Sequence, residues 1–429
     1  MTEKHYRVET LALHAGQSPD PATSAFAVPV YRTTAYQFRD SKHGADLFAL
    51  KELGNIYSRL MNPTNDVLEK RLAALDGGAA AVSMASGTAA IYFAITNLLR
   101  AGDELVSTSN LYGGTYTQFD AILPQGGIQV RFTPVNDFAA VEAAINGRTR
   151  AIFLETLGNP LLDMADLARY AEIAHRHRLP LIVDATFTPP TLLRPIEHGA
   201  DIVIHSLSKW IGGHGTGIGG VVVDSGRFDW SEPKFALFNE PDRGYHGLRF
   251  AHDLGPLNPV AFALRLRIVG LRNQGPTLAP DAAWQFIQGV ETLPLRMARH
   301  SENALRVAEH LKRHPKVAWV RYPGLADDPS HALAARYLSG GFGGMVVVGV
   351  KGGREAGVKL VDNIALFGHM ANVGDAKSLI IHPASTTHSQ LGPKEQAAVG
   401  ISPELLRISV GLEHIDDILG ALDDALALI

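Results

Sequence analysis

The sequence contains no cysteine among its 429 residues. This absence excludes disulfide bonds, thiolate metal ligands and a cysteine nucleophile. An excess of charge of one sign is also missing, because 39 Lys and Arg residues face 43 Asp and Glu residues and give a formal net charge of −4. Such a balance offers no electrostatic basis for binding nucleic acid or an anionic membrane surface. The 18 histidines show no ligand spacing, so no metal site is expected.

Long apolar runs are missing as well. Residues 344–350 are typical of the longest, at about eight residues, whereas a membrane-spanning helix needs about 20. The N-terminal stretch MTEKHYRVET has no apolar core of a signal peptide. Hydrophobic residues make up 46% of the chain and charged residues 19%, which is typical of a folded protein with a large core. We therefore expect a cytoplasmic enzyme that acts on small molecules.

The length predicts two or three domains. Residues 1–65 are rich in Pro, Thr, Tyr and Gly and show little helical periodicity, which predicts an irregular arm that contacts a neighbouring subunit. Residues 66–285 predict a large domain, with an insertion at 231–282 where the periodicity weakens. Residues 286–429 predict a smaller C-terminal α/β domain.

Short apolar strands alternate with amphipathic helices through the predicted large domain. The expected strands are 80–84, 104–107, 151–155, 181–184, 202–205 and 220–223, and the expected helices are 66–75, 88–99 and 164–177. This alternation predicts an α/β fold with a mainly parallel, doubly wound sheet. Ligands of such sheets bind at the carboxyl ends of the strands. For the smaller domain, the pattern predicts strands at 343–350 and 406–410 and a final helix from His414.

Two motif matches lack the neighbouring elements or partner motifs that their usual functions require. Residues 215–220 fit G-x-G-x-x-G, but these glycines precede a strand, whereas a dinucleotide fingerprint follows one. Residues 206–209 fit S-x-x-K, but the S-D-N and K-T-G partners of β-lactamases are absent from the sequence. Neither pattern supports a function.

Charged side chains stand at the ends of two predicted strands. Asp184 ends the strand 181–184, and Lys209 follows the strand 202–205 after two short hydroxyl residues, Ser206 and Ser208. A buried lysine is costly unless it is paired or serves as an amine nucleophile. One such lysine alone is more often structural, but an acidic residue at the end of a nearby parallel strand weakens that interpretation.

A phosphate site is predicted where a strand meets a helix, at Ser86-Gly87-Thr88. Together with Lys209 and Asp184, these groups match pyridoxal 5'-phosphate (PLP), which needs an imine-forming lysine and an acid beside its pyridine nitrogen. Tyr112 is the candidate for stacking on the ring. An amino-acid substrate needs a partner for its carboxylate, and Arg407 is the candidate, although a lone arginine is more often part of a surface salt bridge.

The chain resembles the cysteine/methionine-metabolism family of fold-type I PLP-dependent enzymes over essentially its whole length. The motifs that carry the resemblance are Tyr57-Ser58-Arg59, Asn62-Pro63-Thr64, Ala85-Ser86-Gly87, Leu111-Tyr112-Gly113-Gly114-Thr115, Glu155-Thr156, Gly158-Asn159-Pro160, Val183-Asp184, His205-Ser206-Leu207-Ser208-Lys209-Trp210, Lys377-Ser378-Leu379, His382-Pro383-Ala384-Ser385-Thr386-Thr387-His388 and Arg407-Ile408-Ser409-Val410-Gly411. This resemblance implies a large domain with a mainly parallel sheet, a smaller C-terminal domain and PLP as the cofactor.

The resemblance also implies roles for individual positions. Lys209 is the implied Schiff-base lysine and proton shuttle, Asp184 the partner of the pyridine nitrogen and Tyr112 the stacking ring and a catalytic acid/base. The implied cofactor ligands are Ser86, Gly87, Thr88, Ser206 and Ser208, with Tyr57 and Arg59 completing the site of the neighbouring subunit. The implied contacts to a cofactor oxygen or to the substrate carboxylate are Asn159, Ser378 and Arg407. A shared site implies at least a dimer, and the family commonly forms tetramers.

Within this family, several segments resemble the O-acetylhomoserine sulfhydrylase branch. They are the insertion 231–282 with Gly244-Tyr245-His246-Gly247, Gly213-His214-Gly215-Thr216, Gly374-Asp375-Ala376-Lys377-Ser378-Leu379 and Ser385-Thr386-Thr387-His388-Ser389-Gln390-Leu391. This branch implies γ-replacement, in which sulfide or methanethiol displaces acetate from O-acetylhomoserine and gives homocysteine or methionine.

Two positions depart from the family pattern. Ala185 stands where asparagine is usual, and Thr88 stands where glutamine is frequent. The change at Ala185 removes a polar group that could orient Asp184 or the cofactor. Alternatives therefore stay open: O-succinylhomoserine sulfhydrylase, cystathionine γ-synthase or γ-lyase activity, or γ-substitution with a carbon or other nucleophile. A non-catalytic binding or regulatory protein is disfavoured because Lys209, Asp184, Tyr112 and Arg407 are all present.

Overall fold

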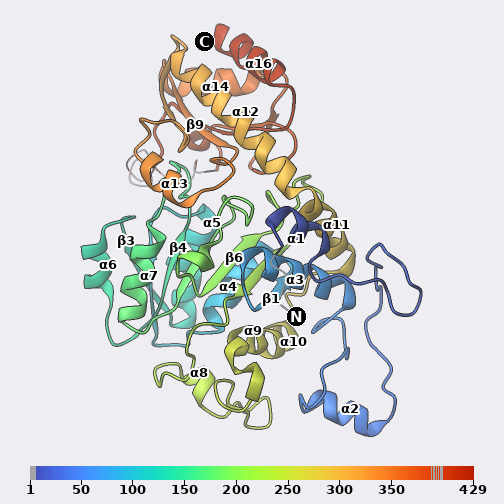
Figure 1. Ribbon diagram of the computed structural model, residues 1–429. Helices are drawn as coiled ribbons and strands as arrows, with labels where there is room; N and C mark the ends of the chain where they lie inside the picture. Colours follow the sequence, from blue (N-terminus) through green and yellow to red (C-terminus); the bar gives the residue numbers. More distant parts are fainter. Residues whose placement is uncertain (1–5, 388, 390–391, 393, 395, 397–399) are drawn as a thin grey trace.

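The computed structural model describes residues 6–387, 389, 392, 394, 396 and 400–429. His388, Gln390 and Leu391, which belong to the motifs quoted above, lie outside the described residues. The chain forms a larger lobe around a seven-stranded sheet and a smaller lobe around a five-stranded sheet (Figure 1). This arrangement confirms the predicted α/β fold with a second, smaller C-terminal unit.

The large sheet has the strand order β1-β7-β6-β5-β4-β2-β3. Its strands are β1 (Ala80–Met84), β2 (Glu104–Thr108), β3 (Gln129–Thr133), β4 (Thr149–Glu155), β5 (Leu181–Asp184), β6 (Ile202–Ser206) and β7 (Gly220–Asp224). Strand β7 runs antiparallel to both of its neighbours, while the other pairs are parallel. The sheet is therefore mainly parallel, as the sequence predicts.

Both faces of this sheet are buried, and strand β5 shows how. Leu181 and Val183 belong to the apolar cluster that includes side chains of α3 (Pro63–Asp76), whereas Ile182 belongs to the cluster that includes side chains of α4 (Gly87–Thr96). A strand with apolar contacts on both faces is apolar at every position, which explains the continuous run in the sequence. Asp184, the first polar residue of the run, stands where the strand reaches the edge of the core.

The other helices of the larger lobe follow the strands or lie in the insertion. They are α5 (Gly113–Thr117), α6 (Phe138–Ala144), α7 (Leu167–Arg176), α8 (Ala236–Asn239), α9 (Ala261–Arg265), α10 (Arg272–Gln274) and α11 (Pro280–Glu291). Neither β3 nor α6 was predicted. Strand β3 is at the sheet edge, and its exposed Gln129 and Arg131 alternate with partly buried residues, so the strand lacks a continuous apolar run.

The N-terminal arm contains two helices, α1 (Val8–His14) and α2 (Ser41–Phe48), so the prediction of a wholly irregular arm was wrong in this respect. Helix α2 is stabilised locally, because the side chain of Asp40 accepts a hydrogen bond from the His43 backbone N–H at 2.7 Å. Figure 1 shows α2 at the end of a long excursion away from the large sheet. Contact of this arm with a neighbouring subunit stays a prediction.

The smaller lobe has the strand order β10-β11-β12-β9-β8. Its strands are β8 (Val317–Arg321), β9 (Met345–Val350), β10 (Gly368–His369), β11 (Leu379–Ile381) and β12 (Leu405–Ser409), and its helices are α13 (His331–Tyr337), α14 (Gly353–Asn363) and α16 (Ile415–Ala427). Helix α12 (Leu293–Arg313) runs from the larger lobe along the smaller one (Figure 1). The predicted boundary at 285–286 lies inside α11, and we propose that the domains instead divide between α11 and α12.

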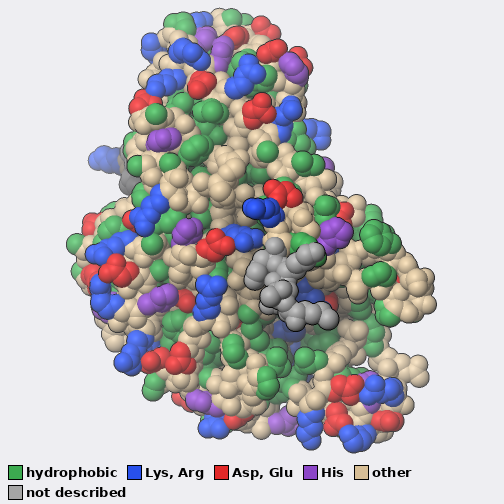
Figure 2. Space-filling model, in the orientation of Figure 1, with side chains coloured by type: hydrophobic (Ala, Val, Ile, Leu, Met, Phe, Trp, Pro, Cys, Tyr) green, Lys and Arg blue, Asp and Glu red, His purple; other side chains and the backbone are tan. Residues whose placement is uncertain are grey.

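Positive and negative side chains are mixed across the face shown in Figure 2. Within the described residues, no helix combines the length and the apolar character that crossing a membrane requires.

Candidate active site

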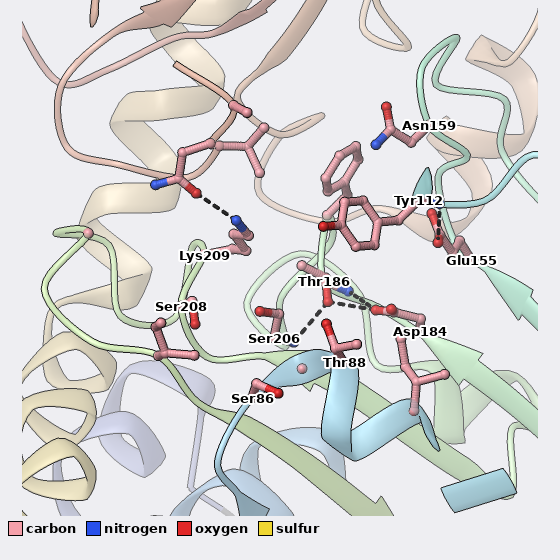
Figure 3. A pocket seen from close by; sticks show the side chains of 18 of the residues that line it. Ser86, Thr88, Tyr112, Glu155, Asn159, Asp184, Thr186, Ser206, Ser208 and Lys209 are labelled. Carbon is pink, nitrogen blue, oxygen red and sulfur yellow. Dashed lines mark hydrogen bonds between the residues drawn. The ribbon is translucent and has the colours of Figure 1, made fainter. Parts of the chain in front are cut away.

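A cavity of about 340 Å³ opens at the carboxyl ends of β4, β5 and β6 (Figure 3). It brings together side chains from both lobes. Of the predicted site residues, those that line it are Ser86, Gly87, Thr88, Tyr112, Asn159, Asp184, Ser206, Ser208, Lys209 and Arg407. Their roles stay predictions, but their convergence on one cavity is a structural fact.

Lys209 lies in the turn after β6, with its side chain in the cavity. Its Nζ atom donates a hydrogen bond to Asn372 Oδ1 at 2.6 Å. Burial lowers the pKa of Lys209, and the positive charge of Arg407 lowers it further. Both effects favour the neutral amine, which is the form that acts as a nucleophile or as a base.

Asp184 ends β5 and points into the cavity (Figure 3). Its Oδ1 atom accepts hydrogen bonds from the Thr186 backbone N–H at 2.9 Å and from the Thr186 hydroxyl at 2.6 Å. Burial raises the pKa of Asp184, although the Thr186 hydrogen bonds and the charge of His205 oppose the shift. A carboxylate in this place is best stabilised by a cationic partner in the cavity, such as a protonated ring nitrogen.

The phosphate cradle is formed by the start of α4 and the end of β6. Ser86 is the N-cap of α4, and its Oγ atom accepts a hydrogen bond from the Ala89 backbone N–H at 3.0 Å. A Cβ atom on Gly87 would lie 2.6 Å from Cβ of Ser206, so only glycine permits this close approach. The first-turn N–H groups of the helix lack intrahelical acceptors, and they favour an anion. An anion cradle, an amine and a carboxylate around one cavity together fit PLP.

Arg407, on β12, reaches the cavity from the smaller lobe. Its Nη1 atom donates to Asn159 Oδ1 at 3.2 Å, and in the described chain no carboxylate pairs with it. Burial lowers the pKa of Arg407 to about 10, which leaves the guanidinium charged near neutral pH. The guanidinium is thus available for a substrate carboxylate. The ring of Tyr112, 53% exposed, stands beside the open space of the cavity.

Three predicted residues lie elsewhere. Tyr57 and Arg59 line a separate cavity of about 860 Å³ that is bordered by α2, and the Arg59 guanidinium lies 4.8 Å from the centre of the Tyr57 ring. Ser378 is fully buried, donates to Glu413 Oε2 at 2.9 Å and accepts from the Gly411 N–H at 2.9 Å. Both hydrogen bonds keep the Ser378 side chain within the protein, and the implied contact of this residue with a cofactor oxygen or the substrate carboxylate stays a prediction.

The two departures from the family pattern differ in their positions. Ala185 is fully buried in the apolar cluster that includes side chains of α3, on the face of the sheet opposite Ile182, and it does not line the cavity. The predicted effect of Ala185, the loss of a polar group that could orient Asp184 or the cofactor, stays a prediction. Thr88 does line the cavity, and its carbonyl accepts a hydrogen bond from the Gln118 amide at 3.0 Å.

Sequence reasoning missed the roles of Thr186, Asn372 and Glu155. Thr186 follows Asp184 by two residues, which is a spacing that permits a local side-chain turn and could have been recognised. Glu155 accepts a hydrogen bond from the Tyr112 backbone N–H at 2.7 Å. Asn372 is 163 residues from its partner Lys209, and no local pattern signals such a contact.

The comparisons with known proteins agree with this geometry. The family model for Cys/Met metabolism PLP-dependent enzymes matches residues 9–427. An O-acetyl-L-homoserine sulfhydrylase of Leptospira meyeri is 52% identical, over 99% of this chain and 97% of that protein. A homocysteine synthase of Schizosaccharomyces pombe is 52% identical, over 97% of both chains. A crystal structure from Campylobacter jejuni, assigned as an O-acetylhomoserine (thiol)-lyase and carrying a pyridoxyl-lysine phosphate, superposes with a TM-score of 0.94 at 41% identity, over 98% of this chain and 100% of that one.

Proposed function

Since the chain belongs to the Cys/Met metabolism PLP-dependent enzymes, we propose that it transfers the four-carbon amino-acid skeleton of O-acetylhomoserine to sulfide or methanethiol. The bond between the γ-carbon and the acetate oxygen breaks, acetate leaves with the electron pair, and a carbon–sulfur bond forms. The products are acetate and either homocysteine or methionine. The observation that carries the proposal is the convergence of Lys209, Asp184 and Arg407 on one cavity.

The proposed role of each residue in this reaction follows from its chemistry. When bound, PLP supplies an electron sink for the substrate α-carbon. Lys209 in its neutral form removes and returns protons at the substrate carbons, and Arg407 holds the substrate carboxylate. Asp184 keeps a negative charge beside the ring nitrogen, and Tyr112 stacks on the ring. The start of α4 and Ser206 hold the phosphate.

The substrate and the nucleophile are tested by product analysis. The purified protein, loaded with PLP, is given O-acetylhomoserine or O-succinylhomoserine, each with sulfide, and the products are identified by mass spectrometry. We expect homocysteine from the acetyl donor at a rate well above that from the succinyl donor. A faster reaction with the succinyl donor, or 2-oxobutyrate in place of homocysteine, would contradict the proposed reaction.

Removing the guanidinium at Arg407 should mainly weaken substrate binding. An unpaired buried carboxylate costs about 2–5 kcal/mol, so Arg407→Ala should raise KM for O-acetylhomoserine by about 30-fold or more. The matched variant Arg407→Lys keeps the charge but loses the two-point geometry, and we expect an intermediate KM. Steady-state kinetics at saturating sulfide provide the measurement. An unchanged KM in Arg407→Ala would show that the substrate carboxylate binds elsewhere.

We further propose a homo-oligomer in which dimers share active sites, with Tyr57 and Arg59 serving the cavity of the neighbouring subunit. Their position outside the cavity of their own chain supports this arrangement. Tetramer formation and residence in the cytoplasm stay predictions.

A mixing experiment tests the shared site. Arg59→Ala and Lys209→Ala should each be nearly inactive. If sites combine residues of two subunits, an equal mixture of the two variants, unfolded and refolded together, should recover about a quarter of wild-type activity, because half of the dimers carry one intact site. The separately refolded variants, combined afterwards, are the control. No recovery in the co-refolded mixture would show that Arg59 acts within its own chain.

A further inference from the structure

Two carboxyl groups stand side by side at the carboxyl edge of the large sheet. Glu155 ends β4, Asp184 ends β5, and the two residues are in register on these neighbouring parallel strands. Both residues are only 7% exposed, and both line the cavity. The proposed reaction uses Asp184 alone, which leaves a buried acidic residue without a role.

Glu155 is bonded to the main chain that carries the stacking ring. Its Oε1 atom accepts the Tyr112 backbone N–H at 2.7 Å, and α5 begins one residue later (Figure 3). One side of the ring lies close to Gly114, where a Cβ atom would lie 2.5 Å from Cε1 of Tyr112. A shift of the main chain at Tyr112 would move the ring with it. Glu155 therefore helps to fix the main chain that carries the ring.

The two carboxyl groups cannot both be ionised without a large cost, because they are buried together. Asp184 has the better support for a negative charge: two hydrogen bonds from Thr186 and the nearby charge of His205. Glu155 has one backbone hydrogen bond, and burial together with the charge of Asp184 raises its pKa well above 4.5. Lys209 and Arg407 line the same cavity, but within the described chain neither forms an ion pair with Glu155.

We propose that Glu155 is a positioning residue that works as a neutral acid. It holds the main chain of Tyr112 in place, and the negative charge at this edge of the sheet is carried by Asp184 alone. A protonated carboxyl group keeps an oxygen that accepts a hydrogen bond, so neutrality does not cost the contact to Tyr112. The inference rests on the cofactor part of the proposed function and is independent of the acyl donor and of the nucleophile.

The test compares Glu155→Gln with Glu155→Ala in substrate-free protein. Glutamine keeps the acceptor oxygen and the shape and carries no charge, so it imitates the proposed neutral acid. We expect Glu155→Gln to bind PLP within about threefold of wild type and to show the same pH dependence of visible absorbance. Glu155→Ala leaves the Tyr112 N–H without its acceptor and should bind PLP about tenfold or more weakly. Equilibrium dialysis and an absorbance titration give both quantities.

Glu104→Gln is the matched control. Glu104 is a glutamate of similar burial, 2% exposed, but its Oε2 atom accepts a hydrogen bond from the Asn146 amide at 2.7 Å, and it lines neither this cavity nor the one that contains Arg59. Its substitution should lower the thermal unfolding temperature and leave the visible pH profile unchanged. A change in this profile confined to the Glu155 variants therefore reports on the cavity and not on general stability.

Each outcome decides a separate point. A midpoint shifted by about one pH unit or more in Glu155→Gln would show that Glu155 is charged, and would overturn the inference. Wild-type affinity for PLP in Glu155→Ala would show that the residue positions nothing. If the alanine variant fails to fold, the glutamine variant still decides the charge state. Failure of the wild-type protein itself to bind PLP would overturn the proposed function instead.

Discussion

Lys209→Ala protein should be colourless after incubation with PLP and should lose turnover by about four orders of magnitude or more. A positioned proton-transfer group contributes about 10²–10⁴-fold, and the covalent attachment of the cofactor is lost as well. Lys209 is the only lysine among the described residues that line the cavity. No neighbouring amine is therefore placed to substitute for it.

The matched control is Lys234→Ala. Lys234 is also half-buried, burial also lowers its pKa, and its Nζ atom donates to the His177 carbonyl at 2.8 Å, but it lies outside the cavity. This variant should keep the visible absorbance and nearly all of the activity. The measurements are an absorbance spectrum and the rate of homocysteine formation. Wild-type turnover in purified Lys209→Ala would refute the assignment of this lysine.

Asp184→Asn should lower kcat/KM by about 150- to 5,000-fold. Removing one partner of a buried charge pair costs about 3–5 kcal/mol, and in the proposed function the other partner is the protonated ring nitrogen of the cofactor. Asparagine has nearly the same shape and can still accept the Thr186 hydrogen bonds, so the loss reports on charge and not on packing. The visible absorbance of the bound cofactor should also change its pH dependence.

Asp201→Asn controls for the loss of a buried aspartate. Asp201 is 4% exposed, and it accepts hydrogen bonds from the Leu181 N–H at 2.8 Å and from His175 at 2.9 Å, away from the cavity. We expect this variant to unfold at a lower temperature while the absorbance of its cofactor stays that of wild type. An Asp184→Asn protein with wild-type kcat/KM and absorbance would show that no charge is needed at this position.

The sequence predicted those parts of the fold that depend on local patterns. Strand β5 is predicted to the residue, because burial on both faces makes it continuously apolar and a charged residue ends it. Helix α2 was missed because it is short, with eight residues of which only Gly44 and Leu47 are buried, and it depends on a cap from Asp40. Strand β3 was missed because it is an edge strand with exposed polar positions.

The same distinction, between local patterns and contacts of distant segments, applies to the site. Lys209 and Asp184 could be predicted because Asp184 ends one buried strand, Lys209 lies in the turn after its neighbour, and parallel strands end at one edge. The bond from Lys209 to Asn372 and the bond from Tyr112 to Glu155 depend on how distant segments are folded together. Such contacts leave no periodic or spaced pattern in a single sequence, so they were found only in three dimensions.

Helix α12 runs from the larger lobe along the smaller one, and this has a consequence for how mutations act on the site. Arg296, in its first turn, donates to the carbonyls of Trp210 and Ile211, directly after Lys209, at 2.7 and 3.0 Å. The larger lobe carries Lys209, the proposed proton-transfer group, whereas Arg407, which is proposed to bind the substrate carboxylate, belongs to the smaller one. Because Asn372 of the smaller lobe accepts the hydrogen bond of the Lys209 amine at 2.6 Å, a mutation that tilts this lobe would change both the length of substrate that fits and the environment of that amine. Substrate choice and bond chemistry are therefore coupled through the smaller lobe.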